Sequence, residues 1–177
     1  GDALEVLSRA KIYLDDSPAG EWLLSIKSKA RRLKMESGLD LIIIDYLQLM
    51  SSGNSMNRVQ EVSDISRWLK SLARELDVPV VALSQLSRWV EARPDKRPVM
   101  SDLRESGSIE QDADIIAMIY RDDYYNEFSE IPGVTNVMIR KNRNGPTWQI
   151  DLKFEKSQQK FYELERTQQQ EHEYSGE

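Results

Sequence analysis

The chain has 177 residues, 40% hydrophobic and 31% charged, which is typical of about one soluble globular domain. It contains no cysteine and a single histidine, His172, which excludes disulfides, thiolate metal sites and histidine-based triads or metal clusters. The net charge of −6 argues against a broadly basic nucleic-acid coat, and no stretch approaches the ~20 apolar residues of a membrane span, so we expect a cytoplasmic protein without a membrane partner.

The N-terminal part of the sequence predicts a strand, a helix and a second strand. KIYLDD, residues 11–16, predicts a short strand, and a helix follows with Gly38 as its stop signal. LIIIDYLQLM, residues 41–50, predicts a buried strand whose apolar run ends at Asp45. The apolar face of the helix comprises Trp22, Leu23, Ile26, Ala30 and Leu33.

The clearest helix in the sequence follows the small-residue polar loop SSGNSMN, residues 51–57. It continues through ELD at 75–77, and VPVVALS at 78–84 then predicts a second buried strand that ends beside Gln85. Strand, helix and strand together predict a parallel unit with a right-handed crossover. The apolar positions of this helix are Val59, Val62, Ile65, Leu69, Leu72 and Leu76.

The second half of the sequence changes character. Residues 85–112 carry two prolines and many charges and predict mostly loop, and ADIIAMIYR at 113–121 predicts a third buried strand. From Val134 the pattern alternates as in paired strands, with a turn at residues 144–146.

These elements predict an α/β fold whose sheet is parallel at its centre and antiparallel toward the C-terminus. We expect one domain over residues 1–165. Residues 166–177 are acidic and rich in glutamine, which predicts a disordered tail.

Asp45 is the first candidate site residue. Burying a carboxylate without a partner is costly, so Asp45 should emerge at the carboxyl end of its strand, where Ser84 and Gln85 also emerge. Such an aspartate matches the one that holds the Mg²⁺ of a nucleotide in phosphate-cleaving ATPases, but it can equally cap a following turn or helix. A phosphate-binding loop, GxxxxGK[ST], would decide between the two, and no glycine in the 177 residues is followed by lysine.

A second candidate is the basic run RKNRNGP. Lys141 and Arg143 are two residues apart beside a predicted turn, so they should project from the same side of an extended strand. The alternative is a solvated charged edge that protects the sheet from aggregation.

The third candidate is MSDLRESGSIEQDAD, predicted as part of a long loop. Main-chain N–H groups around residues 106–108, with Arg104 beside them, could bind a phosphate. The alternative is that Asp102 or Ser108 caps a helix.

Several blocks together resemble the C-terminal, RecA-like motor domain of bacterial and phage replicative DNA helicases, the DnaB-type family. The blocks are DYLQLM, VPVVALSQLSR, DKRPVMSDLRESGSIEQDADIIAMIYRDDYY and RNGPT, which occur in the family's order. The resemblance extends from about Ile12 to Leu164, and the DLRESGSIEQDAD run is highly specific. It implies a RecA-like sheet that lacks the strand before the phosphate loop, because that loop, the catalytic glutamate and the collar domain lie upstream of Gly1 in the family. Asn142 and Trp148 depart from the family's usual residues.

The resemblance implies roles for the candidate residues. Asp45 would hold the Mg²⁺ of ATP, and Gln85 would sense the nucleotide and relay its state to DNA-contacting loops. In the family's ring-shaped homohexamer, Lys141 and Arg143 would reach into the ATP site of the neighbouring subunit.

The same resemblance implies that Arg104, Glu105 and Gly107 line a central channel and contact the phosphates of single-stranded DNA, with SSGNSMN as a second channel-facing loop. The implied function is that of part of a replicative 5′-to-3′ DNA helicase driven by ATP hydrolysis, with a primase and a helicase loader as further partners. We expect this chain alone to be inactive. The alternative is a non-catalytic RecA-like module for DNA binding or subunit docking.

Overall fold

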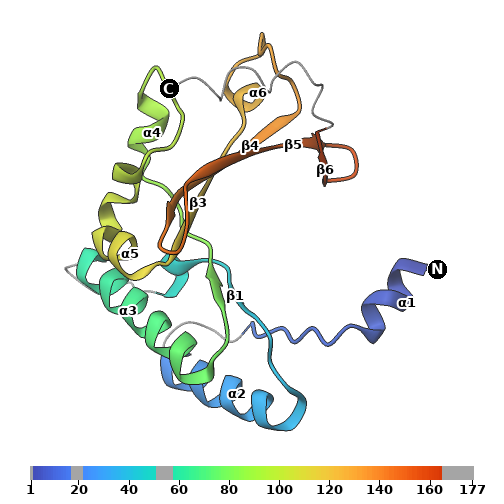
Figure 1. Ribbon diagram of the computed structural model, residues 1–177, viewed down its shortest axis with the longest axis vertical. Helices are drawn as coiled ribbons and strands as arrows, with labels where there is room; N and C mark the ends of the chain where they lie inside the picture. Colours follow the sequence, from blue (N-terminus) through green and yellow to red (C-terminus); the bar gives the residue numbers. More distant parts are fainter. Residues whose placement is uncertain (1, 17–21, 51–57, 165–177) are drawn as a thin grey trace.

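The computed structural model describes residues 2–16, 22–50 and 58–164, which form a mixed α/β structure with two separate sheets (Figure 1). The predicted tail and the SSGNSMN loop lie outside these described residues. In chain order the elements are α1 (Asp2–Arg9), α2 (Trp22–Ser37), β1 (Ile42–Ile44), the 3-10 helix η1 (Leu47–Met50), α3 (Arg58–Leu76), β2 (Val80–Ala82), α4 (Trp89–Ala92), the 3-10 helix η2 (Met100–Ser106), α5 (Gly107–Asp112), β3 (Ile115–Tyr120), α6 (Asp122–Tyr125), β4 (Val134–Asn142), β5 (Trp148–Glu155) and β6 (Lys160–Glu163).

The first sheet is the predicted parallel pair. Strand β1 lies beside β2 with Ile42 opposite Val80 and Ile44 opposite Ala82, and α3 connects the two strands. Both strands are shorter than predicted, because the chain leaves β1 after Ile44 and forms η1. Helices α2 and α3 are confirmed, and Gly38 ends α2 with φ +81°, the left-handed conformation that glycine adopts readily.

Helix α3 is the centre of the core. Leu72 and Leu76 pack with Ala30 of α2 and with Val78, as the helical spacing predicts. A second cluster joins α3 to η1 and α5, and Val59 at the start of the helix is 46% exposed. The buried members of that second cluster are Leu47, Met50, Val62, Ile65, Leu69 and Ile109.

The second sheet is antiparallel, in the order β3-β4-β5-β6, and the predicted turn between β4 and β5 is present. Met118 of β3 and Met138 of β4 face each other in the register and are 3% and 0% exposed. The prediction of buried strands is wrong for all three candidates: burial alternates along β3, where Ile119 is 64% exposed, and neither β1 nor β2 contains a buried residue. Only one face of this sheet packs against the core formed by Leu103 and its neighbours.

Two further expectations differ from the structure. Residues 11–16 form no strand, and Figure 1 shows this segment and α1 extending away from the rest of the chain. A strand needs a hydrogen-bonded neighbour, and none of the described strands lies beside it. The parallel and antiparallel parts are both present as predicted, but no described strand joins them into one sheet.

The predicted loop at 85–112 contains three short helical elements, α4, η2 and α5. The buried carboxylate of Asp102 accepts a hydrogen bond from the Val99 N–H at the start of η2 (2.7 Å), which confirms the alternative that Asp102 caps a helix. The same carboxylate binds both terminal nitrogens of Arg93 at 2.8 and 2.9 Å, which ties α4 to η2. Among the described residues, Ser108 Oγ has no hydrogen-bond partner.

In the part of the chain that the structure covers, no helix is both long and apolar enough to cross a membrane.

Candidate functional site

The carboxyl ends of β1 and β2 bring Asp45 and Gln85 to one edge of the parallel pair. Asp45 follows β1 directly and Gln85 lies three residues after β2, and both are exposed. The two exits are held together by main-chain hydrogen bonds from Leu83 N–H to the Ile44 carbonyl and from Leu47 N–H to the Leu83 carbonyl, each 2.9 Å. The edge therefore has the geometry expected of a ligand site at the carboxyl ends of parallel strands.

Gln48 of η1 connects the segment after β1 to the segment after β2. No pattern in the sequence singles this residue out. Its amide oxygen accepts from the Gln85 N–H, and its amide nitrogen donates to the Gln85 carbonyl and to Ser84 Oγ, all at 3.2 Å. The Gln48 amide thereby holds both the N–H and the carbonyl of Gln85. Among the described residues no cation forms an ion pair with Asp45.

The oxygen donors at this edge suit Mg²⁺ that arrives with a nucleotide. Mg²⁺ is a hard cation that is bound through one or two carboxylates plus the phosphates of the substrate, and Asp45 supplies one carboxylate beside hydroxyl and amide oxygens. In the described ranges no three acidic or histidine side chains converge on a metal position by themselves. This edge therefore fits a metal held jointly with a nucleotide.

Lys141 contacts the C-terminal end of α5, about thirty residues earlier in the sequence. Its ammonium donates to the carbonyls of Glu110, Gln111 and Ala113, the last at 2.7 Å. These are carbonyls that the end of a helix leaves without intrahelical partners, and a cation there also complements the helix dipole. Lys141 therefore caps α5.

Arg143 contacts the same end of α5, so the prediction that it shares a side with Lys141 is confirmed. Its Nη2 donates to the Gln111 carbonyl at 3.0 Å, and its Nη1 lies 3.2 Å from Asp114 Oδ1. Its main-chain N–H also donates to the Asp114 carbonyl at 2.8 Å. The side chain remains 44% exposed.

Asp114 is held in turn by Lys70 of α3, whose ammonium binds its other carboxylate oxygen. The hydrogen bond from Lys70 is the largest influence that holds the pKa of this carboxyl below its ordinary value; partial burial opposes it, and Arg143 adds to it. Lys70 and Asp114 are 44 positions apart, which is why no local pattern could pair them.

Arg104, Glu105 and Gly107 lie where η2 passes into α5, and not in an irregular loop. The main chain at Gly107 is exposed, and a Cβ added there would meet no atom within 4 Å. An exposed backbone at this point is compatible with a phosphate contact.

Helix α5 connects the three groups of candidate residues. It starts at Gly107 and ends where Lys141 and Arg143 bind, and its buried Ile109 shares a core cluster with Leu47 and Met50 of η1. The structure therefore does not gather the predicted residues into one pocket. It places them at three points of one packed unit.

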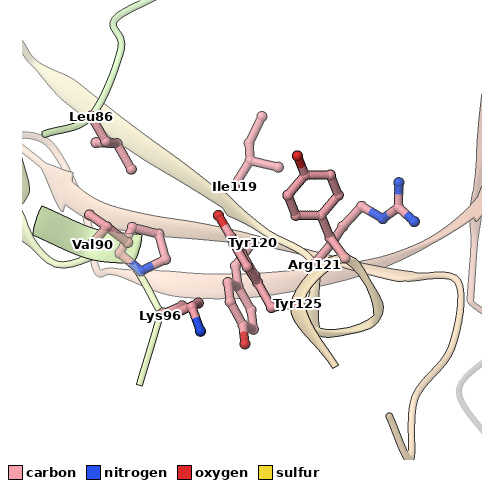
Figure 2. A pocket seen from close by; sticks show the side chains of 9 residues that line it. Leu86, Val90, Lys96, Ile119, Tyr120, Arg121 and Tyr125 are labelled. Atoms are coloured by element: carbon pink, nitrogen blue, oxygen red, sulfur yellow. The ribbon is translucent and has the colours of Figure 1, made fainter. Parts of the chain in front are cut away.

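A separate hollow of about 200 Å³ lies between α4, β3 and α6, and none of the predicted site residues lines it (Figure 2). Figure 2 shows Lys96 beside Tyr125, and the ammonium lies 5.5 Å from the centre of that ring. Tyr120 stacks on Tyr125 with ring centres 6.1 Å apart. Burial is the largest influence that raises the pKa of both hydroxyls above the ordinary tyrosine value.

Comparison with solved structures shows that the fold of this chain is similar to that of ATPase domains of DnaB-like helicases. One structure, whose title describes it as an "ATPase Domain", matches with a TM-score of 0.85 at 47% identity, over 92% of this chain and 58% of that one. A second, titled "The Structure Of A DnaB-Like Replicative Helicase And Its Interactions With Primase", matches with the same TM-score and identity and is covered to 40% of its length.

The family model for the DnaB-like helicase C terminal domain matches residues 1–163, and the chain belongs to that family. It is 61% identical over 166 residues to the replicative DNA helicase DnaB of Geobacillus stearothermophilus, and 60% identical to the replicative DNA helicase DnaC of Bacillus subtilis. In both cases 93% of this chain is covered, and the chain spans 36% of the length of the relative.

Proposed function

We propose that this chain is part of a replicative DNA helicase that couples ATP hydrolysis to 5′-to-3′ translocation on single-stranded DNA and to unwinding of the duplex. The observation that carries the proposal is the family match over residues 1–163, a range that contains all seven predicted site residues. The 61% identity to a protein named as a replicative DNA helicase supports the same activity.

In a homohexameric ring, Asp45 would hold the Mg²⁺ of the ATP bound to its own subunit. Bound Mg²⁺ neutralises the charge of the phosphates. Gln85 would lie beside this nucleotide and relay its state to the DNA-contacting segment. Two observations support the relay: Gln48 fixes the main chain of Gln85, and η1, which carries Gln48, shares a buried core cluster with α3 and α5.

Lys141 and Arg143 would act on the ATP of the neighbouring subunit. A guanidinium there stabilises the negative charge that spreads over the phosphoryl oxygens in the transition state, more than it stabilises bound ATP. The partial exposure of Arg143 at the end of α5 supports this role, because the side chain is accessible to another subunit.

Arg104, Glu105 and Gly107 would line the central channel, where side-chain and main-chain N–H donors of this segment contact the phosphates of single-stranded DNA. The exposed main chain at Gly107 supports such a contact. A chain with a net charge of −6 can bind a polyanion when a few basic and N–H donors from six subunits converge on one channel.

A primase and a helicase loader are the proposed protein partners, in the cytoplasm. The similarity to a helicase whose structure is titled with its primase interactions supports the first partner. We assign no residues of this chain to either surface.

The test uses a chimera in which residues 1–163 replace the matching region of the Geobacillus stearothermophilus relative, hereafter the full-length chimera. We expect it to hydrolyse ATP and to unwind a fork with a 5′ single-stranded arm. Asp45→Asn should abolish both activities because it weakens the metal site, whereas Asp40→Asn, an exposed aspartate just before β1, should leave both unchanged.

The isolated chain is the second control, and it should hydrolyse no ATP because its 177 residues contain no lysine-bearing phosphate loop. A folded chimera without ATPase activity, or an Asp45→Asn chimera at full activity, would contradict the proposal.

A further inference from the structure

We propose that Asp114 is a positioning residue for Arg143: its carboxylate, anchored to α3 through Lys70, orients the guanidinium for the nucleotide of the neighbouring subunit. The inference deepens the function proposed above and rests on it. Three contacts carry it, and all of them connect residues far apart in sequence.

Arg143 is fixed to Asp114 at two points. The main-chain N–H of Arg143 donates to the Asp114 carbonyl at 2.8 Å, and the guanidinium lies 3.2 Å from the carboxylate. One residue therefore fixes both the start and the end of the arginine side chain. A long side chain with several rotatable bonds loses most of its freedom under this arrangement.

The residue that anchors Asp114, Lys70, lies in α3, the helix that contributes to two of the core clusters. Lys70 belongs to α3, whose neighbouring Leu69 and Leu72 are 6% and 1% exposed. Lys70 binds one carboxylate oxygen and Arg143 faces the other. Asp114 thereby fixes the guanidinium relative to α3 as well as relative to the turn that carries Arg143.

The two basic residues at the end of α5 differ in how many of their N–H donors are used. The ammonium of Lys141 has three N–H donors, and three carbonyls of the α5 end accept from it. The guanidinium of Arg143 has five N–H donors and contacts only Asp114 and the Gln111 carbonyl among the described residues. Arg143 therefore keeps donors for a phosphate, whereas Lys141 would exchange contacts with the α5 carbonyls for one.

Stability alone does not account for the arrangement. The side chains of Asp114 and Arg143 are 46% and 44% exposed, and ion pairs between groups this exposed contribute little to folding. Orientation of a reacting group is a different matter, because a misplacement of about 1 Å can lower a rate about 100-fold. The two roles therefore predict different outcomes for the same substitution.

The test compares Asp114→Ala and Asp114→Asn in the full-length chimera. Asp114→Ala should lower kcat for ATP about 10- to 100-fold with little change in KM or in the thermal midpoint. Asp114→Asn keeps an oxygen acceptor and should lose less. Asp64→Asn is the matched control, because Asp64 forms an exposed ion pair with Arg67 on α3, and it should behave as the unmodified chimera.

A double variant separates positioning from a general structural effect. If Asp114 acts through Arg143, adding Asp114→Ala to Arg143→Ala should cost nothing further, so the two losses are not multiplicative. Multiplicative losses, or a wild-type kcat in Asp114→Ala while Arg143→Ala is inactive, would overturn the inference and leave the proposed function intact. Full activity of Arg143→Ala itself would instead overturn the proposed role of Arg143.

Discussion

The carboxyl ends of β1 and β2 and the C-terminal end of α5 both carry residues predicted to act on a nucleotide, yet they are built in opposite ways. At the first, Asp45 is exposed and forms no ion pair with a described cation. At the second, Lys141 and Arg143 are bound to the carbonyls of α5 and to Asp114. The carboxylate of Asp45 at the ends of β1 and β2 is not bound by a described cation. The cations of Lys141 and Arg143 at the end of α5 are already held by hydrogen bonds and an ion pair within the chain.

The two regions also differ in how deeply the apolar side chains of their strands are buried. Ile43 of β1 and Val81 of β2 are 64% and 48% exposed, whereas Met138, in the strand that carries Lys141, is fully buried. Exposed apolar strands normally mark a surface that other residues cover. The strand that carries Lys141 therefore buries part of its apolar surface within the described chain, whereas β1 and β2 leave apolar side chains exposed.

Removal of Arg143 should have the largest effect at the α5 end. In the full-length chimera, Arg143→Ala should lower ATP hydrolysis about 1,000-fold or more while ATP binding stays nearly unchanged, because the guanidinium acts on charge that develops in the transition state. The measurements are steady-state hydrolysis and equilibrium nucleotide binding. A charged sheet edge without a catalytic role predicts a change near zero.

Mixing decides whether Arg143 acts across a subunit interface. Arg143→Ala subunits and subunits with a disabled phosphate loop are each expected to be inactive alone, but mixed rings contain some interfaces with both functional halves. Hydrolysis recovered on mixing supports action in trans. Near-normal ATPase activity in homogeneous Arg143→Ala rings would remove this residue from the site.

A core substitution tests the difference in packing between the two regions. Met138→Ala in the isolated chain should lower the free energy of unfolding by about 2–5 kcal/mol, because it leaves a cavity at a fully buried position. Ile43→Ala removes an apolar side chain that is 64% exposed and should change the free energy by less than ~0.5 kcal/mol. Urea denaturation measures both, and equal losses would show that Ile43 is covered in solution.

The smallest expected effect concerns the start of α5. Arg104→Ala in the full-length chimera should weaken single-stranded DNA binding similarly for all base sequences, since a phosphate contact carries no base information. A salt series should show the slope of log affinity against log salt reduced by about one. Arg67→Ala, on the surface of α3, is the control, and an Arg104 variant with unchanged affinity and slope would exclude this residue from DNA binding.

Local sequence patterns correctly predict the elements whose formation depends on neighbouring residues. The spacing of Leu69, Leu72 and Leu76 predicts α3 because the same periodicity decides which side chains it buries. The turn between β4 and β5 and the stop at Gly38 are predicted from residues that favour these conformations.

The expectations that failed have two different causes. Residues 11–16 have the composition of a strand but no described neighbour to pair with, whereas η2 is accompanied by local contacts of Asp102 with the Val99 N–H and with Arg93, three and nine positions away. The contacts of Lys141 with α5 and of Lys70 with Asp114 cross about thirty and 44 positions, so only the fold reveals them. Sequence patterns and the family resemblance identify Asp45, Gln85, Lys141 and Arg143 as candidates but not the residues that hold them.

Trp148 is the first residue of β5 and pairs with Ile139 of β4, so its indole is a fluorescent probe within the β4–β5 hairpin. The indole is 44% exposed and lies in the strand that follows the turn with Arg143, whereas Trp68 is half-buried in the α3 core and Trp89 is 77% exposed at α4. Indole emission responds to the polarity around the ring, so a subunit closing over this hairpin would shift the Trp148 component of the spectrum. In the proposed ring, assembly at an interface that includes Arg143 would therefore change the Trp148 contribution to intrinsic fluorescence, without an attached dye.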